Sequence, residues 1–166
     1  MTRLLLIIMT ALLLNVGAAW AGPYEEGNDA FNRGDFAEAA KQFRLVAAQG
    51  DARGQAGLCT LYEDGSGVPQ DYTEALKWCR LAAVQGNWTA QIALCDLYIN
   101  GQGVPQDYVR AHMWCNLASA LPGSASDIRS ASGLRDALSK RMTPQQIADA
   151  QKLARDCRQR NFKDCD

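Results

Sequence analysis

Histidine is almost absent from this chain of 166 residues, and His112 is its only representative. A metal site or proton relay built on several imidazoles therefore has little basis. No cysteine is followed by another cysteine three positions later, the usual spacing of a zinc ligand pair. We expect no metal and no cofactor.

The chain also lacks an excess of either charge. Its 17 lysines and arginines stand against 18 aspartates and glutamates, which gives a formal net charge of −1. A surface that binds nucleic acid or an anionic membrane would show clustered lysines and arginines. We predict that nucleic acid is not a partner.

A long apolar run occurs only at the start of the chain. Arg3 precedes the apolar stretch Leu4–Val16, and Ala19-Trp20-Ala21 follows as a cleavage site of small residues. The run is too short to span a bilayer comfortably. Residues 1–21 are therefore predicted to be a signal peptide, cleaved after Ala21. The protein would be exported, either to the periplasm or as a secreted protein, with no stable membrane insertion after cleavage.

The most informative feature is a segment of 36 residues that occurs twice in tandem. Residues 52–87 and 88–123 align without a gap and are identical at 17 of 36 positions. Both copies contain Gly-x-Gly-Val-Pro-Gln-Asp-Tyr, at Gly65–Tyr72 and Gly101–Tyr108. A fixed period of this length is typical of a solenoid, in which each unit buries its apolar face against the next.

Each unit reads as two helices with a sharp break between them. Apolar residues recur at helical spacing on both sides of the glycine- and proline-containing stretch, which ends the first helix. Asp71 and Glu74 are predicted to form a capping box at the second helix, whereas only the Asp107 cap remains in the second unit. The acidic pair Glu63-Asp64 is replaced by Ile99-Asn100 in the second unit, and we interpret it as a solvated helix end. His112 takes the position of Leu76 and is interpreted as an ordinary core or surface helix residue.

These motifs resemble the Sel-one-like repeat, a relative of the tetratricopeptide repeat. The resemblance rests on the glycines, proline, tyrosines and tryptophan at the family spacing, namely Leu58, Tyr62, Gly65, Gly67–Tyr72, Ala75 and Trp78. It implies an all-α fold, a right-handed α-solenoid of stacked antiparallel helix pairs, and a role in protein–protein contacts. The chain departs from the family at two pairs of positions. Cys59 and Cys95 replace a usual glycine, and Cys79 and Cys115 replace a usual aromatic residue.

The rest of the chain extends the stack to about eight helices. Residues 22–51 are predicted to be a short N-terminal tetratricopeptide-like repeat, because Gly27, Asp35-Phe36, Ala39 and Phe43 match the later units. Residues 52–87 and 88–123 are the two Sel-one-like repeats. Residues 124–166 are predicted to be a C-terminal capping hairpin with a tail, with one helix through Ile128 to Met142 and a second opened by Thr143-Pro144.

The six cysteines all follow the cleavage site, and an even number in an exported chain indicates disulfides. Cys157 and Cys165 are close enough in sequence to pair across a turn. The other four allow two schemes. Pairing within units gives Cys59–Cys79 and Cys95–Cys115, while the register of neighbouring helices suggests Cys79–Cys95. The second scheme leaves Cys59 and Cys115 as free thiols, which an oxidising compartment disfavours, so we prefer the first.

These features predict that the protein is a non-enzymatic exported scaffold that binds a protein or peptide partner in the cell envelope. The alternative is a structural or cell-wall-binding envelope protein. Penicillin-binding or β-lactamase-like activity, described for some cysteine-rich members of the repeat class, is less favoured, because no serine has a lysine three positions later. The sequence singles out no catalytic residue and no partner-binding residue.

Overall fold

The structure is a computed structural model that describes residues 22–120, 125–163 and 165. The predicted signal peptide, residues 1–21, lies outside the described residues. The described part contains eight α-helices and no strand, and the helices are α2 (Pro23–Asn32), α3 (Phe36–Ala47), α4 (Ala52–Asp64), α5 (Tyr72–Ala83), α6 (Trp88–Asn100), α7 (Tyr108–Ser119), α8 (Ala125–Ser139) and α9 (Pro144–Gln159).

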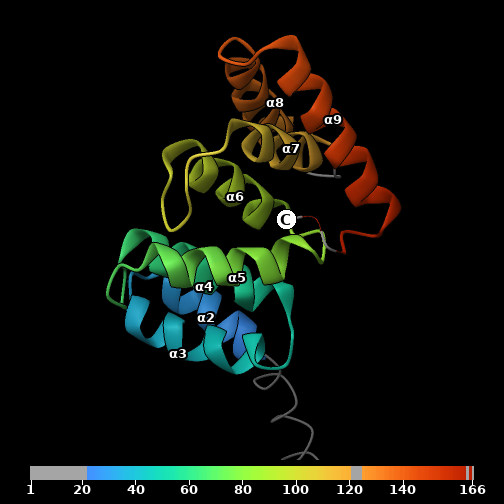
Figure 1. Cartoon of the computed structure of the whole chain (residues 1–166). Helices are drawn as coiled ribbons and strands as arrows, with labels where there is room; N and C mark the ends of the chain where they lie inside the picture. Colours follow the sequence, from blue (N-terminus) through green and yellow to red (C-terminus); the bar gives the residue numbers. More distant parts are fainter. Residues whose placement is uncertain (1–21, 121–124, 164, 166) are drawn as a thin grey trace, which may run out of the picture.

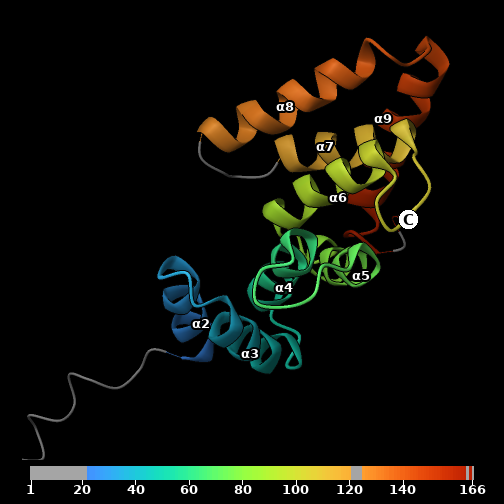
Figure 2. The same ribbon diagram turned by 90° about the vertical axis from the view of Figure 1, so that its left-hand side faces the viewer.

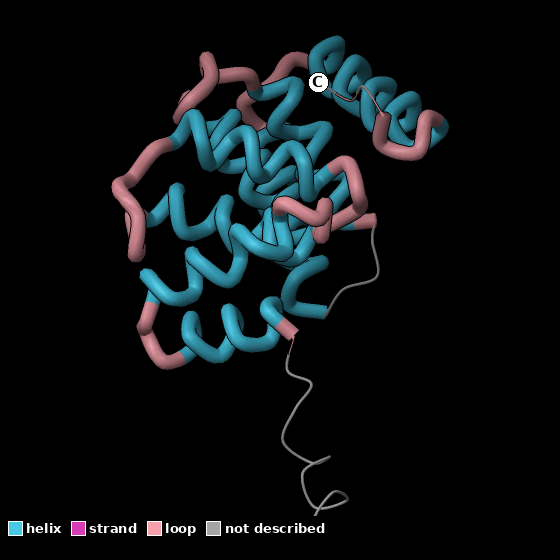
Figure 3. The backbone as a smooth tube through the Cα atoms, turned by 90° about the horizontal axis from the view of Figure 1, so that it is seen from below, coloured by secondary structure: helices cyan, strands magenta, loops and turns pink. Residues whose placement is uncertain are grey.

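The helices form an all-α solenoid, as predicted. From α2 to α8, each helix packs mainly on its neighbours in sequence, so that the pairs α2/α3, α4/α5 and α6/α7 follow one another (Figure 1). α7 also packs against both α8 and α9, which close the C-terminal end (Figure 2). α4 contacts α6 directly. We call α2, α4 and α6 the A layer, and α3, α5 and α7 the B layer; Figure 3 shows that the connections between them are short loops.

The repeated glycine loop has two separate functions in the stack. The first glycine of each loop, Gly65 or Gly101, ends its helix in the left-handed conformation, with φ of 70° and 68°. The second glycine lies against the start of the preceding B-layer helix. A Cβ on Gly67 would overlap the carbonyl of Phe36, and a Cβ on Gly103 would overlap that of Tyr72. The loop is therefore part of the interface between successive units.

Helix caps follow the predicted residues with one correction. The Asp71 carboxylate accepts hydrogen bonds from the backbone N–H groups of Thr73 and Glu74, at 2.9 and 3.1 Å. The predicted capping box at α5 is wrong, because the Glu74 side chain pairs with Lys77 at 3.1 Å. The box at α9 is present, with Thr143 and Gln146 each accepting from the other's backbone.

Three disulfides are present, and they follow the within-unit scheme. Cys59–Cys79 joins α4 to α5, and Cys95–Cys115 joins α6 to α7, with Cα–Cα distances of 5.1 and 5.5 Å. Cys157–Cys165 holds the tail after α9.

The first helix pair has a ring where the later pairs have a disulfide. Gly27 takes the position of Cys59, and Phe43 takes that of Cys79. The Phe43 ring lies only 2.8 Å from where a Cβ of Gly27 would be, so glycine is required there. The same ring lies against Gly57 of α4. Aromatic packing therefore joins the first pair and docks it on the second.

The C-terminal region differs from the prediction in one detail. α8 ends at Ser139 instead of continuing to Met142. Met142 lies in the turn before α9, where it is still buried in the main core. Arg141 in the same turn stacks its guanidinium 4.7 Å from the centre of the Tyr108 ring. These two contacts attach the closing hairpin to α7 and the core beneath it.

Substitution of Gly67 tests the interface role of the loop. Gly67→Ala is expected to lower the free energy of unfolding by about 3 kcal/mol, because left-handed strain adds to overlap with backbone atoms. Gly86→Ala is the matched control: Gly86 also has a positive φ, of 81°, but no atom lies within 4 Å of its Cβ position. The control should cost about 1 kcal/mol. Equal losses in urea titrations of the two variants would contradict the interface role.

Candidate functional site

One candidate site is a hollow of about 330 Å³ on the A layer. Its floor is made of small residues on α4, Ala56 and Gly57, with the Phe43 ring behind them. Its walls carry aromatic rings, uncharged polar groups and one guanidinium. They are contributed by Tyr24, Asn28 and Phe31 of α2, by Arg53 and Thr60 of α4, and by Asn87, Trp88 and Thr89 at the start of α6.

Local helix chemistry positions two of the wall residues. The Asn87 side-chain oxygen caps α6 by accepting from the N–H of Ala90 at 3.0 Å, which leaves the amide NH₂ of Asn87 available to a ligand. The Arg53 guanidinium lies 4.2 Å from the centre of the Tyr24 ring and so fixes that ring at the edge of the hollow.

The positive charge of Arg53 is already balanced within the protein. Its guanidinium binds the Asp51 carboxylate at 2.7 Å and approaches that of Glu25 at 3.6 Å. The hydrogen bond from Arg53 holds the pKa of the Asp51 carboxyl below its usual range. The hollow thus presents no uncompensated cation from this residue.

One helical turn beyond Thr60, the A layer carries a pair of carboxyl groups. Burial, together with the nearby charges of Asp96 and Asp64, raises the pKa of Glu63 to about 7. Burial also raises the pKa of Asp96, on α6. Neither carboxylate has an ion-pair or hydrogen-bonding partner among the described residues. The interpretation of Glu63 as a solvated helix end is therefore wrong, because α6 packs beside α4 and partly covers it.

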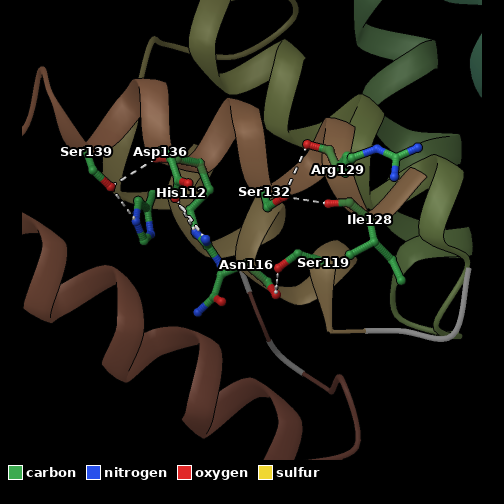
Figure 4. A network of polar contacts seen from close by, with 9 residues as sticks. His112, Asn116, Ser119, Ile128, Arg129, Ser132, Asp136 and Ser139 are labelled. Carbon is green, nitrogen blue, oxygen red and sulfur yellow. Dashed lines mark hydrogen bonds and ion pairs between the residues drawn. The ribbon is translucent and has the colours of Figure 1, made fainter. Parts of the chain in front are cut away.

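His112 lies in a polar network between α7 and α8 (Figure 4). Only 2% of its surface is exposed, and burial lowers the pKa of the imidazole, with a further contribution from Arg135. Its Nε2 lies 3.1 Å from the Ser139 hydroxyl, which itself donates to the Arg135 carbonyl at 3.0 Å. The Ser139 hydroxyl thus has a backbone carbonyl as acceptor besides its contact with the imidazole. This pair does not have the geometry of a nucleophile and its base.

Other serines of the network behave in the same way. Ser119 donates to the Asn116 carbonyl at 2.9 Å, and Ser132 donates to the Ile128 carbonyl at 2.7 Å (Figure 4). Such bonds to the preceding turn are common for serine in helices and have no catalytic implication.

Within the described ranges, no group of three histidine, cysteine or acidic side chains could hold a metal ion. No helix among these residues is long and apolar enough to cross a membrane.

Comparison with known proteins identifies the two repeats. The Sel1 repeat model matches residues 52–87 and 88–122. The chain contains two Sel1 repeats. The Sel-one-like resemblance found in the sequence is thus confirmed.

Two solved structures share the fold of these Sel1 repeats. One is the crystal structure of c5321, a protective antigen present in uropathogenic Escherichia coli strains and displaying an SLR fold. It is 29% identical over 92% of this chain and 32% of its own, with a TM-score of 0.76. The other is a Sel1 repeat protein from Oxalobacter formigenes, 22% identical over 90% of this chain and 68% of its own, with a TM-score of 0.56. The chain therefore spans about a third of the length of c5321. A comparison with curated protein sequences gives no match.

The Sel1 fold is a scaffold typical of protein–protein interaction. The sequence predicted that role but singled out none of the residues that line the hollow. A signal for them does exist in the repeats. All seven lining residues from residues 52–123 occupy positions at which the two Sel1 units differ, namely Arg53, Ala56, Gly57, Thr60, Asn87, Trp88 and Thr89. Positions held constant between the units maintain the stack, so the differing ones are free to shape a site.

The raised pKa of Glu63 predicts a dependence of stability on pH. The folded protein keeps this proton up to about pH 7, whereas the unfolded chain loses it near its ordinary pKa of 4.5. The contribution is therefore fully present below pH 4.5 and is lost as the pH rises to 7. Glu63→Gln should gain stability relative to wild type over that window, by about 1 kcal/mol once screening by solvent is allowed for. Urea titrations at pH 4.5, 6 and 7.5 measure the difference, and a constant difference would contradict the buried location of the carboxyl.

Proposed function

We propose that the protein is an exported, non-enzymatic scaffold that holds a protein or peptide partner in the hollow of its A layer. The observation that carries the proposal is the hollow itself, with Tyr24 and Trp88 on opposite walls and the amides of Asn28 and Asn87 beside them. Aromatic rings supply contact area at low entropic cost, and amides can bind the backbone of an extended chain.

The location is supported by the cysteines. Three disulfides are characteristic of a protein that folds in an oxidising compartment. The predicted signal peptide agrees with export, and the periplasm or the exterior of the cell are the compartments we propose.

Site-specific photo-crosslinking in cells tests this function. A benzophenone amino acid is introduced at Asn28 or Thr89, both exposed residues of the hollow, and as a matched control at Lys41 or Thr73 on the B layer. A protein crosslinked from the hollow positions and not from the controls supports the scaffold function. Retention of the protein on isolated murein sacculi, with no protein crosslinked, would favour the cell-wall alternative instead.

A further inference from the structure

Charge is distributed unevenly between the two layers, although the whole chain is nearly neutral. The three A-layer helices contain six acidic residues and one basic residue, while the three B-layer helices contain two acidic and five basic residues. The aspartates that cap these helices can be added to the count: Asp51 in the A layer, and Asp35, Asp71 and Asp107 in the B layer. The A layer then has seven acidic residues and one basic residue, and the B layer has five of each. The A layer is therefore strongly negative on either count.

The only basic residue of the A-layer helices does not offset this field at the hollow. Arg53 is bound to Asp51 and approaches Glu25, so its charge is compensated at short range. The remaining carboxylates of α4 and α6 have no such cation nearby among the residues that the structure describes. A hollow within a surface of one sign favours a partner of the opposite sign and accelerates its approach.

Glu63 and Asp96 form a pair of carboxyl groups beyond one end of the hollow, whose raised pKa values make their charge depend on pH. Glu63 follows the wall residue Thr60 by three positions, which places it one turn further along α4, about 5 Å along the helix axis. Asp96 lies two turns beyond the wall residue Thr89 on the adjacent α6, close enough to Glu63 for their charges to interact. Both are partly buried, and the described residues include no cation that neutralises them.

We propose that the A layer binds an extended basic segment of its partner, with an apolar or aromatic side chain in the hollow and a lysine or arginine between Glu63 and Asp96. An extended chain advances about 3.3 Å per residue, so the cation would follow the apolar anchor by about two to four residues. The inference rests on the proposed function and adds the chemistry of the partner.

Proton release accompanies such binding. A lysine or arginine between the two carboxyl groups would lower their pKa values, since an opposite charge favours the ionised form. Because the pKa of free Glu63 is about 7, binding should be tighter at pH 8 than at pH 6. An apolar anchor alone would show no such dependence.

Selection from a displayed library of random ten-residue peptides tests the inference. The target is the protein purified after export, with its disulfides formed. We expect the selected peptides to carry a lysine or arginine two to four residues from an aromatic or aliphatic residue. The affinity of one selected synthetic peptide should fall about 3- to 10-fold on Glu63→Gln or Asp96→Asn, and at high salt. Glu74→Gln, which removes an acidic residue from the B layer, is the matched control and should leave the affinity unchanged.

The outcomes separate the two levels of the proposal. Peptides that bind without a basic residue, or whose affinity is unaffected by Glu63→Gln and Asp96→Asn, overturn the charge inference and leave the scaffold function standing. Selected peptides whose binding is unaffected by Trp88→Ala, with circular dichroism showing an intact fold, place the site elsewhere and overturn the inference as well. No selected peptide, together with no partner crosslinked from the hollow, overturns both.

Discussion

Reduction of the three disulfides is expected to unfold the protein at 37 °C. The chain separations closed by the bridges are 20, 20 and 8 residues. The loss of loop entropy assigns about 3 kcal/mol to each longer bridge and about 2.5 kcal/mol to the shorter one. The total, about 9 kcal/mol, is comparable with the whole stability of an ordinary domain. Thermal unfolding followed by circular dichroism, with and without a phosphine reductant, measures the loss.

The first helix pair supplies the control for this experiment. Cys59→Ser/Cys79→Ser should lose most of the stability of the first bridge. A second variant, Cys59→Gly/Cys79→Phe/Ala93→Gly, introduces the Gly27–Phe43 contact into the first Sel1 repeat. Its third substitution is needed because Ala93 takes the position of Gly57, against which the Phe43 ring lies. This variant should lose much less stability, because the new ring fills the space of the bridge. A reduced protein that melts within a few degrees of the oxidised one would contradict the stabilising role of the bridges.

Truncation of Trp114 is expected to cost about 3–5 kcal/mol, the range for removal of a large aromatic side chain from a core. Trp114 is 0% exposed and is the largest of the fully buried side chains that the structure describes. Three helices, α6, α8 and α9, pack on its helix α7, so alanine would leave a cavity inside the core.

Trp78 provides the matched comparison, because it occupies the same position in the first Sel1 repeat. It is only partly buried, and it packs between the two core clusters. Trp78→Ala should therefore cost about 1–3 kcal/mol. Urea titrations of both variants at one pH give the comparison. Equal losses would show that burial by the C-terminal hairpin is not what makes Trp114 important.

The repeated residues were enough to predict the fold, because each of them has a local physical role. Gly65 and Gly101 end helices, Asp71 and Asp107 begin them, and a cysteine pair spans each unit. Each of these roles depends on residues that are near in sequence or in the same unit, so it can be predicted from a single sequence.

The candidate site could not be predicted in the same way, because it depends on contacts between units. Glu63 looks like an exposed helix end when its own unit is considered alone. Its pKa is raised first by burial and then by the nearby charges of Asp96, on α6, and Asp64, and the burial and the Asp96 contribution depend on the neighbouring unit. The hollow likewise combines α2, α4 and α6, and its depth depends on Gly57 lying against the ring of Phe43. No single residue of the sequence predicts how closely neighbouring units pack in space.

The contact between Gly27 and Phe43 stands where later units have a disulfide, so the first helix pair is held less rigidly than the others. Of the three pairs that build the two layers, α2/α3 is the one whose helices no covalent bond joins. The same pair supplies Tyr24, Asn28, Phe31 and Phe43 to the hollow, while the opposite wall belongs to disulfide-linked helices. Backbone amides of residues 23–47 should then exchange with solvent faster than those of α4 to α7. One side of the hollow would be a fixed frame and the other an adjustable one, which lets a single site accommodate side chains of different size.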